Sequence, residues 1–185
     1  MMEKDQAGDG IRRCGASDAD AILAIINAAA EAYRGVIPPD RWHEPYMPAS
    51  ELASEMADGV AFSGYETGGR LVGVMGTQRR SNVDLVRHAY VLPEWQSHGI
   101  ATRLLQHLCG DAHRPILIGT WAAADWAVRF YERHGFARVG DDDIASLLRT
   151  YWNVPERQVA TSVVLALPPL VDDAARWLIA GATGM

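Results

Sequence analysis

The amino-acid sequence predicts an α/β fold with a mixed, largely antiparallel central sheet flanked by helices. Three β-rich runs follow one another between residues 60 and 92, which is typical of an antiparallel meander. A helix and a continuous apolar strand come next, and this order indicates a β-α-β unit with a parallel strand pair. An amphipathic helix precedes the meander. The combination of a meander with a β-α-β unit therefore predicts a mixed sheet.

The N-terminal part of the chain is predicted to contain a short strand, a helix, a loop and a second helix. Ile11 to Cys14 fit the strand, and Ser17 is the expected N-cap of the first helix, which ends near Gly35. The segment 34–48 contains four prolines, so it is expected to form a stiff loop. The second helix is expected from Ala49 to Ala57.

The remaining elements follow from apolar patterns and their breaks. The meander strands are expected at Val60 to Glu66, Leu71 to Gln78 and Val83 to Leu92, where Pro93 stops the third strand. Residues 96–110 carry leucines on one helical face, and an amphipathic pattern at 141–158 suggests an inserted helix. Further elements are expected at Pro115 to Thr120 (strand), Asp125 to His134 (helix), Val159 to Leu167 (strand) and Asp172 to Ala180 (helix).

Composition and charge limit the class of protein. The chain has 185 residues, 49% hydrophobic and 22% charged, which is typical of one globular domain. We place its core at about residues 10–167, with a short tail at 168–185. No stretch approaches the ~20 apolar residues of a membrane span, and the polar N-terminus does not resemble a signal peptide, so a cytoplasmic protein without a membrane partner is expected. The net charge of −6 argues against nucleic acid as a partner.

Cysteine and histidine usage argues against a disulfide framework and against a metal. The two cysteines, Cys14 and Cys109, are too few for a disulfide scaffold and are expected to be small buried residues. His107, Cys109 and His113 faintly resemble a ligand set, but residues two apart on a helix do not share a face. No metal cofactor is therefore expected. The oligomeric state is left open, a homodimer included.

The most informative segment lies where the third meander strand passes into a helix. Pro93 ends the strand, and Gln96-Ser97-His98-Gly99-Ile100-Ala101-Thr102 leads into the helix. The first backbone N–H groups of a helix have no intrahelical partner and lie at the positive end of the helix dipole. Such a junction binds phosphate groups, and Gly99 lets the backbone approach them closely. The segment therefore predicts a pyrophosphate site.

Two motifs resemble those of the GNAT acetyltransferases. The pyrophosphate loop of that family reads (Arg or Gln)-x-x-Gly-x-(Gly or Ala), which Gln96 to Ala101 match. About 30 residues further on, Ala127 to Phe136 is similar to the second signature of the family, Ala-x-x-Phe-Tyr-x-x-x-Gly-Phe. The resemblance covers roughly residues 10–167 and implies the acyl-CoA N-acyltransferase fold with acetyl-CoA as cosubstrate. One departure is Ala124, where many relatives carry an asparagine that bonds the pantetheine arm of the cofactor or a nearby backbone group.

The resemblance also implies catalytic roles. Tyr131 occupies the position of the general acid of the family, which protonates the leaving thiolate. A backbone N–H near Val91 would polarise the thioester carbonyl. His88, on the strand that leads to Val91, is the candidate general base, with Glu94 and Asp84 as alternatives.

Two variable segments are expected to select the acceptor. In GNAT folds the helix-loop-helix region walls the acceptor site, and here Tyr33, Trp42 and Tyr46 lie in or beside that loop. Tyr151 and Trp152 belong to the segment at 141–158 and are expected to face them across the cleft. The alternative is that these aromatic side chains pack the loop against the hydrophobic core and have no role in acceptor binding.

The sequence thus predicts an N-acetyltransferase that moves an acetyl group from acetyl-CoA to a primary amine of a small molecule by direct attack. Two alternatives stay open at this point. One is acetylation of a peptide or protein amine, and the other is an acyl-CoA-binding sensor without catalysis.

Overall fold

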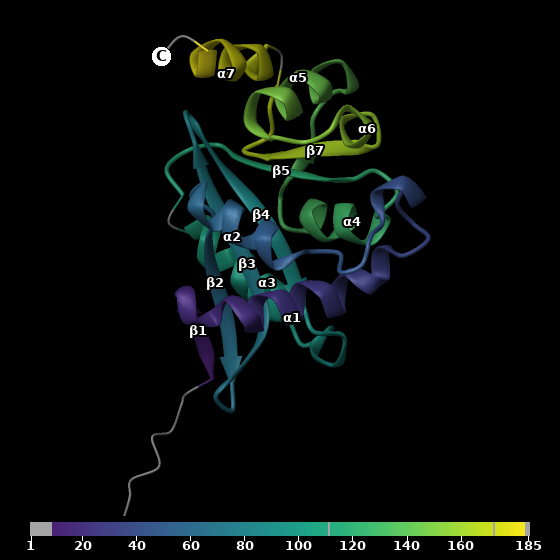
Figure 1. The fold of residues 1–185 in the computed structure, drawn as a ribbon. Helices are drawn as coiled ribbons and strands as arrows, with labels where there is room; N and C mark the ends of the chain where they lie inside the picture. The colour runs from purple at the N-terminus through teal and green to yellow at the C-terminus, as the bar shows by residue number, and fades with distance from the viewer. Residues whose placement is uncertain (1–8, 111, 172, 184–185) are drawn as a thin grey trace, which may run out of the picture.

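The structure, a computed structural model, describes residues 9–110, 112–171 and 173–183. Seven strands form one sheet in the order β1-β2-β3-β4-β5-β7-β6 (Figure 1). All neighbouring strands are antiparallel except β4 and β5, which are parallel. The predicted mixed, largely antiparallel sheet is therefore confirmed. The strands are β1 (Gly10–Arg13), β2 (Ala61–Thr67), β3 (Arg70–Arg80), β4 (Val83–Val91), β5 (Ile116–Trp121), β6 (Ala137–Arg138) and β7 (Ser162–Leu167).

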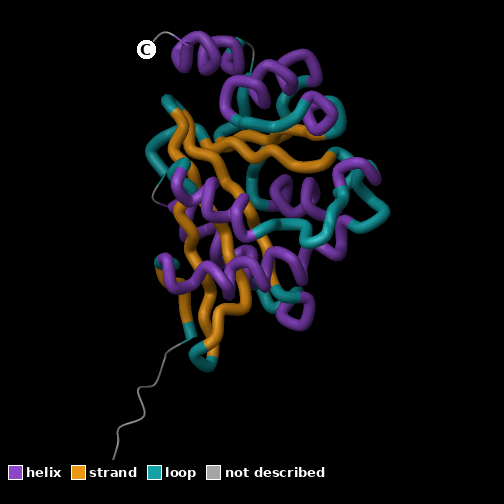
Figure 2. Tube along the Cα trace, viewed as in Figure 1, coloured by secondary structure: helices purple, strands orange, loops and turns teal. Residues whose placement is uncertain are grey.

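Helices cover both faces of the sheet, as the tube view shows (Figure 2). The helices are α1 (Ala19–Ala30), α2 (Ala49–Ala57), α3 (Ile100–Gly110), α4 (Asp125–Arg133), α5 (Asp141–Tyr151), α6 (Glu156–Val159) and α7 (Ala174–Thr183). α1 and α2 lie on one face of the meander and α3 lies on the other (Figure 1). Gly73 of β3 makes this packing close, because a Cβ there would lie 2.8 Å from Ile100 of α3. In the described residues, no helix is long and apolar enough to cross a membrane.

The hydrophobic core has two main parts. The larger cluster joins α1, the meander, α3 and the end of α4, and it includes Ile22, Phe62, Met75, Leu104 and Tyr131. The second cluster joins α5, β7 and α7 over the outer part of the sheet, and it includes Leu117, Leu147, Leu148, Tyr151 and Trp152. α7 belongs to this second cluster through Ala175, so the segment expected as a short tail packs on the fold.

Most differences from the predicted elements are at their ends. The helix expected from residue 96 begins at Ile100, because Ser97 and Gly99 have left-handed backbone angles (φ 64° and 76°) that a helix does not accept. β7 begins at Ser162 instead of Val159, because Glu156–Val159 forms α6.

The start of α1 also differs from the prediction. Ser17 does not cap the helix; instead, the Asp18 carboxylate accepts a hydrogen bond from the Gly15 N–H (2.8 Å). The inserted helix predicted at 141–158 is present as α5, with α6 after it. The predicted terminal helix corresponds to α7, although Asp172 lies outside the described residues.

Candidate active site

A gap opens in the sheet between its two parallel strands. β4 and β5 pair through Asp84 with Ile116, Leu85 with Leu117 and Val86 with Ile118. Beyond these pairs, β4 continues beside β3 as far as Val91, whereas β5 continues beside β7 as far as Trp121. The two strands therefore diverge toward their carboxyl ends, where ligands of parallel strand pairs commonly bind.

A β-bulge bends β4 beside this gap. The register between β3 and β4 shifts between the Val74–Tyr90 and Gly76–Arg87 pairs, and His88 has a φ of 49°. Past the bulge, Leu92 N–H donates to the carbonyl of Val72 on β3 (2.9 Å). Because successive N–H groups of a strand point to opposite sides, the Val91 N–H points away from β3, toward the gap. A carbonyl that entered the gap would meet this donor.

The loop before α3 presents backbone N–H groups to solvent at the mouth of the same gap. Ser97, His98 and Gly99 are exposed, and Gly99 has open space where a Cβ would stand. Arg103 N–H donates to the Gly99 carbonyl (3.0 Å), which closes the first turn of α3. The bond from Arg103 is the first one within the helix. The N–H groups from Gly99 to Thr102 come before it in the chain, so they have no partner in the helix and are available to an anion. This arrangement fits a pyrophosphate group.

Side chains of this loop hold its shape. The Gln96 side-chain amide donates to the carbonyl of Val91 (3.2 Å), so the loop is tied to the end of β4. His98 Nδ1 lies 2.8 Å from the Gln96 carbonyl, and the His98 ring lies against Trp95. The Thr102 hydroxyl lies 3.1 Å from His134 Nε2 at the end of α4. We infer that Gln96, His98 and Thr102 shape the site, while the backbone carries the anion-binding groups.

The remaining two residues of the loop, Ile100 and Ala101, face the protein. Ile100 is buried against β3, and Ala101 packs on the same core cluster while remaining partly exposed. A small side chain at Ala101 leaves room beside the N–H groups of the first turn. The seven loop residues from Gln96 to Thr102 thus form one structural unit.

Tyr131 stands on α4 at the other side of the gap. It is buried and packs edge-on against Phe130 and Phe136 (ring centroids 5.1 and 5.8 Å apart). Burial raises the pKa of its phenol above the ordinary value of 10, and the neighbouring Tyr33 and Cys109 raise it further. The Tyr131 hydroxyl therefore keeps its proton at neutral pH and can donate it.

A second set of aromatic rings, which we call the aromatic group, includes Tyr33 and Tyr90, whose phenols lie near that of Tyr131. Tyr33 is at its centre, with ring centroids 6.2 Å from Tyr46, 6.3 Å from Tyr90 and 5.4 Å from Trp126. Trp42 joins through Tyr46 (5.5 Å). The structure thus brings together Tyr33, Trp42 and Tyr46, as the sequence predicts, and adds Tyr90 and Trp126.

Two phenols of this group, Tyr33 and Tyr90, also keep their protons at neutral pH. Burial raises the pKa of Tyr33 to about 12, with a further contribution from Tyr46, although a hydrogen bond with Thr120 offsets part of it. Burial is also the main cause that raises the pKa of Tyr90, and Tyr46 and Tyr33 add to it. Burial thus keeps Tyr33 and Tyr90 uncharged.

The structure does not bring Tyr151 and Trp152 to the aromatic group. Both are buried in the second core cluster. The Tyr151 hydroxyl bonds the Asn82 side chain (2.7 Å) and the Leu178 carbonyl (2.9 Å), which ties α7 to the turn between β3 and β4. Trp152 packs over Gly119 of β5. The apolar face of α5 turns these rings toward the sheet, so we remove them from the proposed acceptor site.

The expected base, His88, has contacts on the α2 side of β4. Its Nε2 bonds the Glu55 carboxylate, and its ring stacks on Phe62 of β2 (centroids 5.8 Å apart). Glu55 also accepts from Arg87 (2.8 Å), which in turn donates to Gln78 (2.7 Å). None of these partners belongs to the aromatic group. The contacts thus give His88 a structural position, and they do not support its assignment as the base.

The two alternative bases are likewise paired elsewhere. Asp84 lies at the start of β4, 3.8 Å from Arg79, and Glu94 lies 3.5 Å from Arg70 in an exposed ion pair. Both carboxylates therefore pair with arginines that do not belong to the aromatic group.

Glu55 binds both Arg87 and His88, so its neutralisation should destabilise the fold. Burial opposes ionisation of Glu55, but the hydrogen bond from His88 and the charges of His88 and Arg87 lower its pKa below the ordinary 4.5. Its contribution to stability is therefore present above pH ~4.5 and lost as the pH falls through the lower folded pKa. We expect Glu55→Gln to lower the free energy of unfolding by about 2–3 kcal/mol in urea titrations at pH 7.

The matched control for this prediction is Glu51→Gln on the same helix. Glu51 is exposed in the first turn of α2 and acts only through the helix dipole, so its loss should cost well under about 1 kcal/mol. Equal stability of the Glu55→Gln protein and the wild type would contradict the structural role of this carboxylate.

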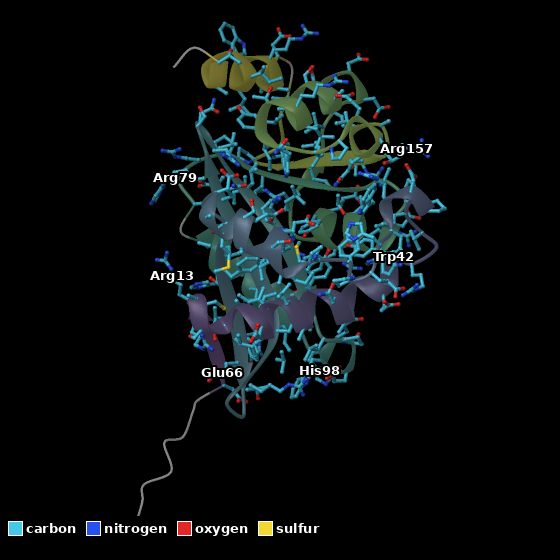
Figure 3. The ribbon with its side chains drawn as sticks, viewed as in Figure 1. Arg13, Trp42, Glu66, Arg79, His98 and Arg157 are labelled. Atoms are coloured by element: carbon cyan, nitrogen blue, oxygen red, sulfur yellow. The ribbon has the colours of Figure 1, made fainter. Side chains whose placement is uncertain are left out.

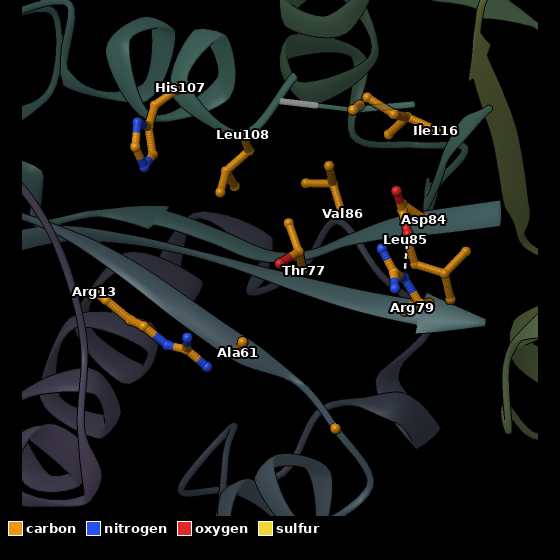
Figure 4. A pocket seen from close by; sticks show the side chains of 12 residues that line it. Arg13, Ala61, Thr77, Arg79, Asp84, Leu85, Val86, His107, Leu108 and Ile116 are labelled. Carbon is orange, nitrogen blue, oxygen red and sulfur yellow. Dashed lines mark ion pairs between the residues drawn. The ribbon is translucent and has the colours of Figure 1, made fainter. Parts of the chain in front are cut away.

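Two cavities lie near the sheet. One, of about 550 Å³, lies between the C-terminal end of α3 and the sheet, and its rim carries Arg13, Arg79 and His107 (Figure 4). The other, of about 560 Å³, is lined by residues 35–39 and 121–123 and by Arg157, Ala160 and Thr161. It adjoins the aromatic group, because Ile37 and Trp121 belong to the same apolar cluster as Tyr33 and Trp42. We call this second one the loop cavity.

The 34–48 loop and the 141–158 segment meet beside the loop cavity. Arg157 of α6 lies 3.5 Å from Asp40 of the 34–48 loop. Figure 3 shows Arg157 and Trp42 on the same side of the molecule, beside α4. The contact is made by α6 and not by Tyr151 or Trp152.

Comparisons with known proteins identify the class. A family model described as an acetyltransferase (GNAT) domain matches residues 26–149, which is more than half of the chain. The chain belongs to the GNAT acetyltransferase family. As a member it is an acetyl-CoA-dependent N-acetyltransferase, and the resemblance seen in its motifs is confirmed. No curated protein matches the chain.

Solved structures show the same fold at low sequence identity. A GNAT-family acetyltransferase from Staphylococcus aureus Mu50 has a TM-score of 0.64 at 16% identity, covering 86% of this chain and 98% of that one. The PaiA N-acetyltransferase from Thermoplasma acidophilum, solved with coenzyme A, gives 0.64 at 14%, with 86% and 98% covered. The ribosomal-protein-S18-alanine N-acetyltransferase from Escherichia coli gives 0.61 at 17%, with 86% and 92% covered. In the described residues, no group of three or more His, Cys, Asp or Glu is placed to hold a metal.

Proposed function

We propose that this enzyme transfers the acetyl group of acetyl-CoA to a primary amine of a small molecule by direct attack. The observation that carries the proposal is the alignment of three features along one gap. These are the N–H groups before α3, the Val91 N–H on β4, and the buried Tyr131 hydroxyl on α4. An anion site, a carbonyl-polarising donor and a proton donor in this order suit a thioester that enters from the α3 end.

Each group has a stated task in the reaction. The N–H groups of residues 97–102 hold the pyrophosphate, with Gly99 leaving space for it. Val91 N–H stabilises the negative charge that develops on the thioester oxygen. Tyr131 donates a proton to the sulfur that leaves. Tyr33, Tyr46, Trp42, Tyr90 and Trp126 surround the acceptor.

A small acceptor is favoured over a peptide by the packing around Tyr33 and by the tie between the 34–48 loop and α6. Tyr33 is packed on three sides by other rings, and the 34–48 loop is tied to α6 through Asp40 and Arg157. An extended peptide needs an open groove, whereas the loop cavity has a volume that suits a small molecule.

A direct assay tests the proposed function. The protein is incubated with acetyl-CoA and a panel of primary amines and short peptides, and free CoA and acetylated products are measured. We expect stoichiometric CoA and acetylamine from small amines. Acetyl-CoA binding without turnover on any amine would favour the sensor, and turnover on peptides alone would favour the peptide alternative.

Trp42 offers a test of the acceptor site. Its ring contacts Tyr46 and lies under the Arg34 guanidinium (4.6 Å). We expect Trp42→Ala to raise the KM for the acceptor by about three- to tenfold and leave the affinity for CoA unchanged, since only uniform acceptor binding is lost. Steady-state kinetics and calorimetry measure both quantities. Trp177→Ala is the control, because that ring is 76% exposed on α7 and should change neither.

A further inference from the structure

The interior of the proposed acceptor site contains phenols and indoles instead of acids and bases. The rings lie against one another, with the Tyr33 centroid 6.2 Å from Tyr46, 6.3 Å from Tyr90 and 5.4 Å from Trp126. An amine bound among them would therefore have phenols and indoles as its immediate neighbours.

The charged groups around the aromatic group are engaged with one another. Arg34 bonds Glu31 (2.8 Å) and Glu44 (2.5 Å) at the end of α1 and in the following loop. On α4, Asp125 lies 3.7 Å from Arg129. These carboxylates belong to exposed ion pairs on the rim.

Two imidazoles belong to segments that also carry rings of the aromatic group, and both have other partners. His43 stacks on Tyr46 at 6.4 Å, is exposed, and bonds the Pro45 carbonyl through Nδ1 (2.9 Å). His88, on β4, is bound to Glu55 of α2. The carboxylates around the site thus lie in ion pairs on its rim, where Arg34 and His43 also stack on Trp42 and Tyr46.

The loop cavity beside the aromatic group disfavours a cation as well. Its lining consists of apolar side chains, backbone, the Thr161 hydroxyl and one charged residue, Arg157. That charge is positive, and its partner Asp40 neutralises it without adding a net negative charge. An ammonium that entered would lose hydration and gain no carboxylate partner.

We propose that the acceptor is a weakly basic primary amine, of the basicity of an α-amino group, which the site takes up in its neutral form. This inference rests on the proposed function and names the substrate class for the same site. The aromatic faces can attract a cation, but this attraction replaces only part of the lost hydration. The site consequently selects against strongly basic, lysine-like amines.

The reaction balances without a separate base when the amine enters neutral. The amine nitrogen attacks the thioester carbon, a C–N bond forms and the C–S bond breaks. Tyr131 gives its proton to the leaving sulfur, and the proton released from the nitrogen restores the Tyr131 hydroxyl. The net products are the acetamide and CoA thiol, with no proton left over.

Basicity decides how much of an amine is available at pH 7. An α-amino group with a pKa near 7.8 is neutral in about one molecule in seven, whereas a lysine-like amine with a pKa near 10.4 is neutral in about one in 2,500. The neutral fraction of a lysine-like amine at pH 7 is therefore about 350-fold smaller than that of an α-amino group. A base on the enzyme would reduce this difference by deprotonating the bound amine.

The test is the pH profile of kcat/KM for a series of benzylamines whose ring substituents lower the basicity stepwise at nearly constant shape. The enzyme is the full chain with saturating acetyl-CoA, and CoA release is followed. We expect kcat/KM to rise tenfold per pH unit below a break and to level off above it. The break should coincide with the pKa of each free amine and move with it along the series.

A break that stays at one pH for every amine would indicate a base on the enzyme and would overturn this inference, while the proposed function would stand. Calorimetric binding of acetyl-CoA with no acetylation of any amine would overturn the proposed function and the inference together. Nucleophilicity changes the height of each profile and leaves the position of the break unaffected.

Discussion

Gly99→Glu is expected to abolish the binding of acetyl-CoA. Gly99 has a φ of 76° and faces open space at the start of α3, where the pyrophosphate is proposed to lie. A carboxylate in that space would repel the phosphates by about 4 kcal/mol per unit charge at 4 Å, taken at an effective dielectric constant of 20. We expect the affinity measured by calorimetry to fall by at least about 100-fold, which is about 2.7 kcal/mol.

Two further variants separate charge from strain. Gly99→Ala forces a side chain into the left-handed region without adding charge, so it should weaken binding far less. Gly110→Glu places the same carboxylate at the far end of α3, where a Cβ also meets open space, and should leave the affinity unchanged. A folded Gly99→Glu protein that binds CoA as the wild type does would contradict the proposed loop.

Tyr131→Phe is expected to lower kcat by more than about tenfold, because general acid catalysis typically contributes about 10²–10⁴-fold. Only the hydroxyl is removed, and the ring contacts with Phe130 and Phe136 remain. The affinity for CoA and the thermal stability should therefore stay near the wild-type values.

The control for Tyr131 is Tyr65→Phe. Tyr65 is also buried, and its hydroxyl accepts a hydrogen bond from Arg103 on α3 (2.7 Å), so Tyr65→Phe removes a buried hydroxyl that lies on β2 and not on α4. Turnover should change little in that variant. Near-normal turnover of Tyr131→Phe would instead give Tyr131 a packing role.

The fold was largely predictable because its signals are local. The apolar runs of β2, β3 and β4 alternate with clear turn residues, and the spacing of Ile22, Ile25 and Ile26 defines the buried face of α1. The sequence pattern predicts that α3 begins at residue 96, four residues before its actual start. The difference arises because Ser97 adopts a left-handed backbone conformation that its residue type does not signal. α6 replaced the start of β7 for a similar reason: four residues carry too little periodicity to tell a helical turn from a strand end.

The candidate site was predictable in the parts that share a motif. Gln96 to Thr102 and Tyr131 follow from two short sequence patterns. Tyr90 was next to Val91 in the first pattern, yet its place in the aromatic group depends on the bulge at His88, which brings β4 back into register. The partners Glu55 and Trp126 depend on tertiary packing, and their sequence neighbourhoods give no signal of it.

The acceptor residues divide according to which core they join. Tyr33, Trp42 and Tyr46 precede α2 and fold over the end of β5, so they meet Trp126 at the start of α4. Tyr151 and Trp152 lie on the buried face of α5 and meet Asn82 and Gly119 instead. Both segments are rich in aromatic residues. Only the three-dimensional packing distinguishes the rings proposed to line the acceptor site from those that belong to the hydrophobic core.

A crystal structure of the enzyme with CoA tests the central claim most directly. The account predicts the pyrophosphate on the N–H groups of residues 97–102, the pantetheine arm in the gap between β4 and β5, and the sulfur within hydrogen-bond distance of the Tyr131 hydroxyl. CoA bound elsewhere, for example against Arg13 and Arg79 in the cavity beside α3, would contradict it.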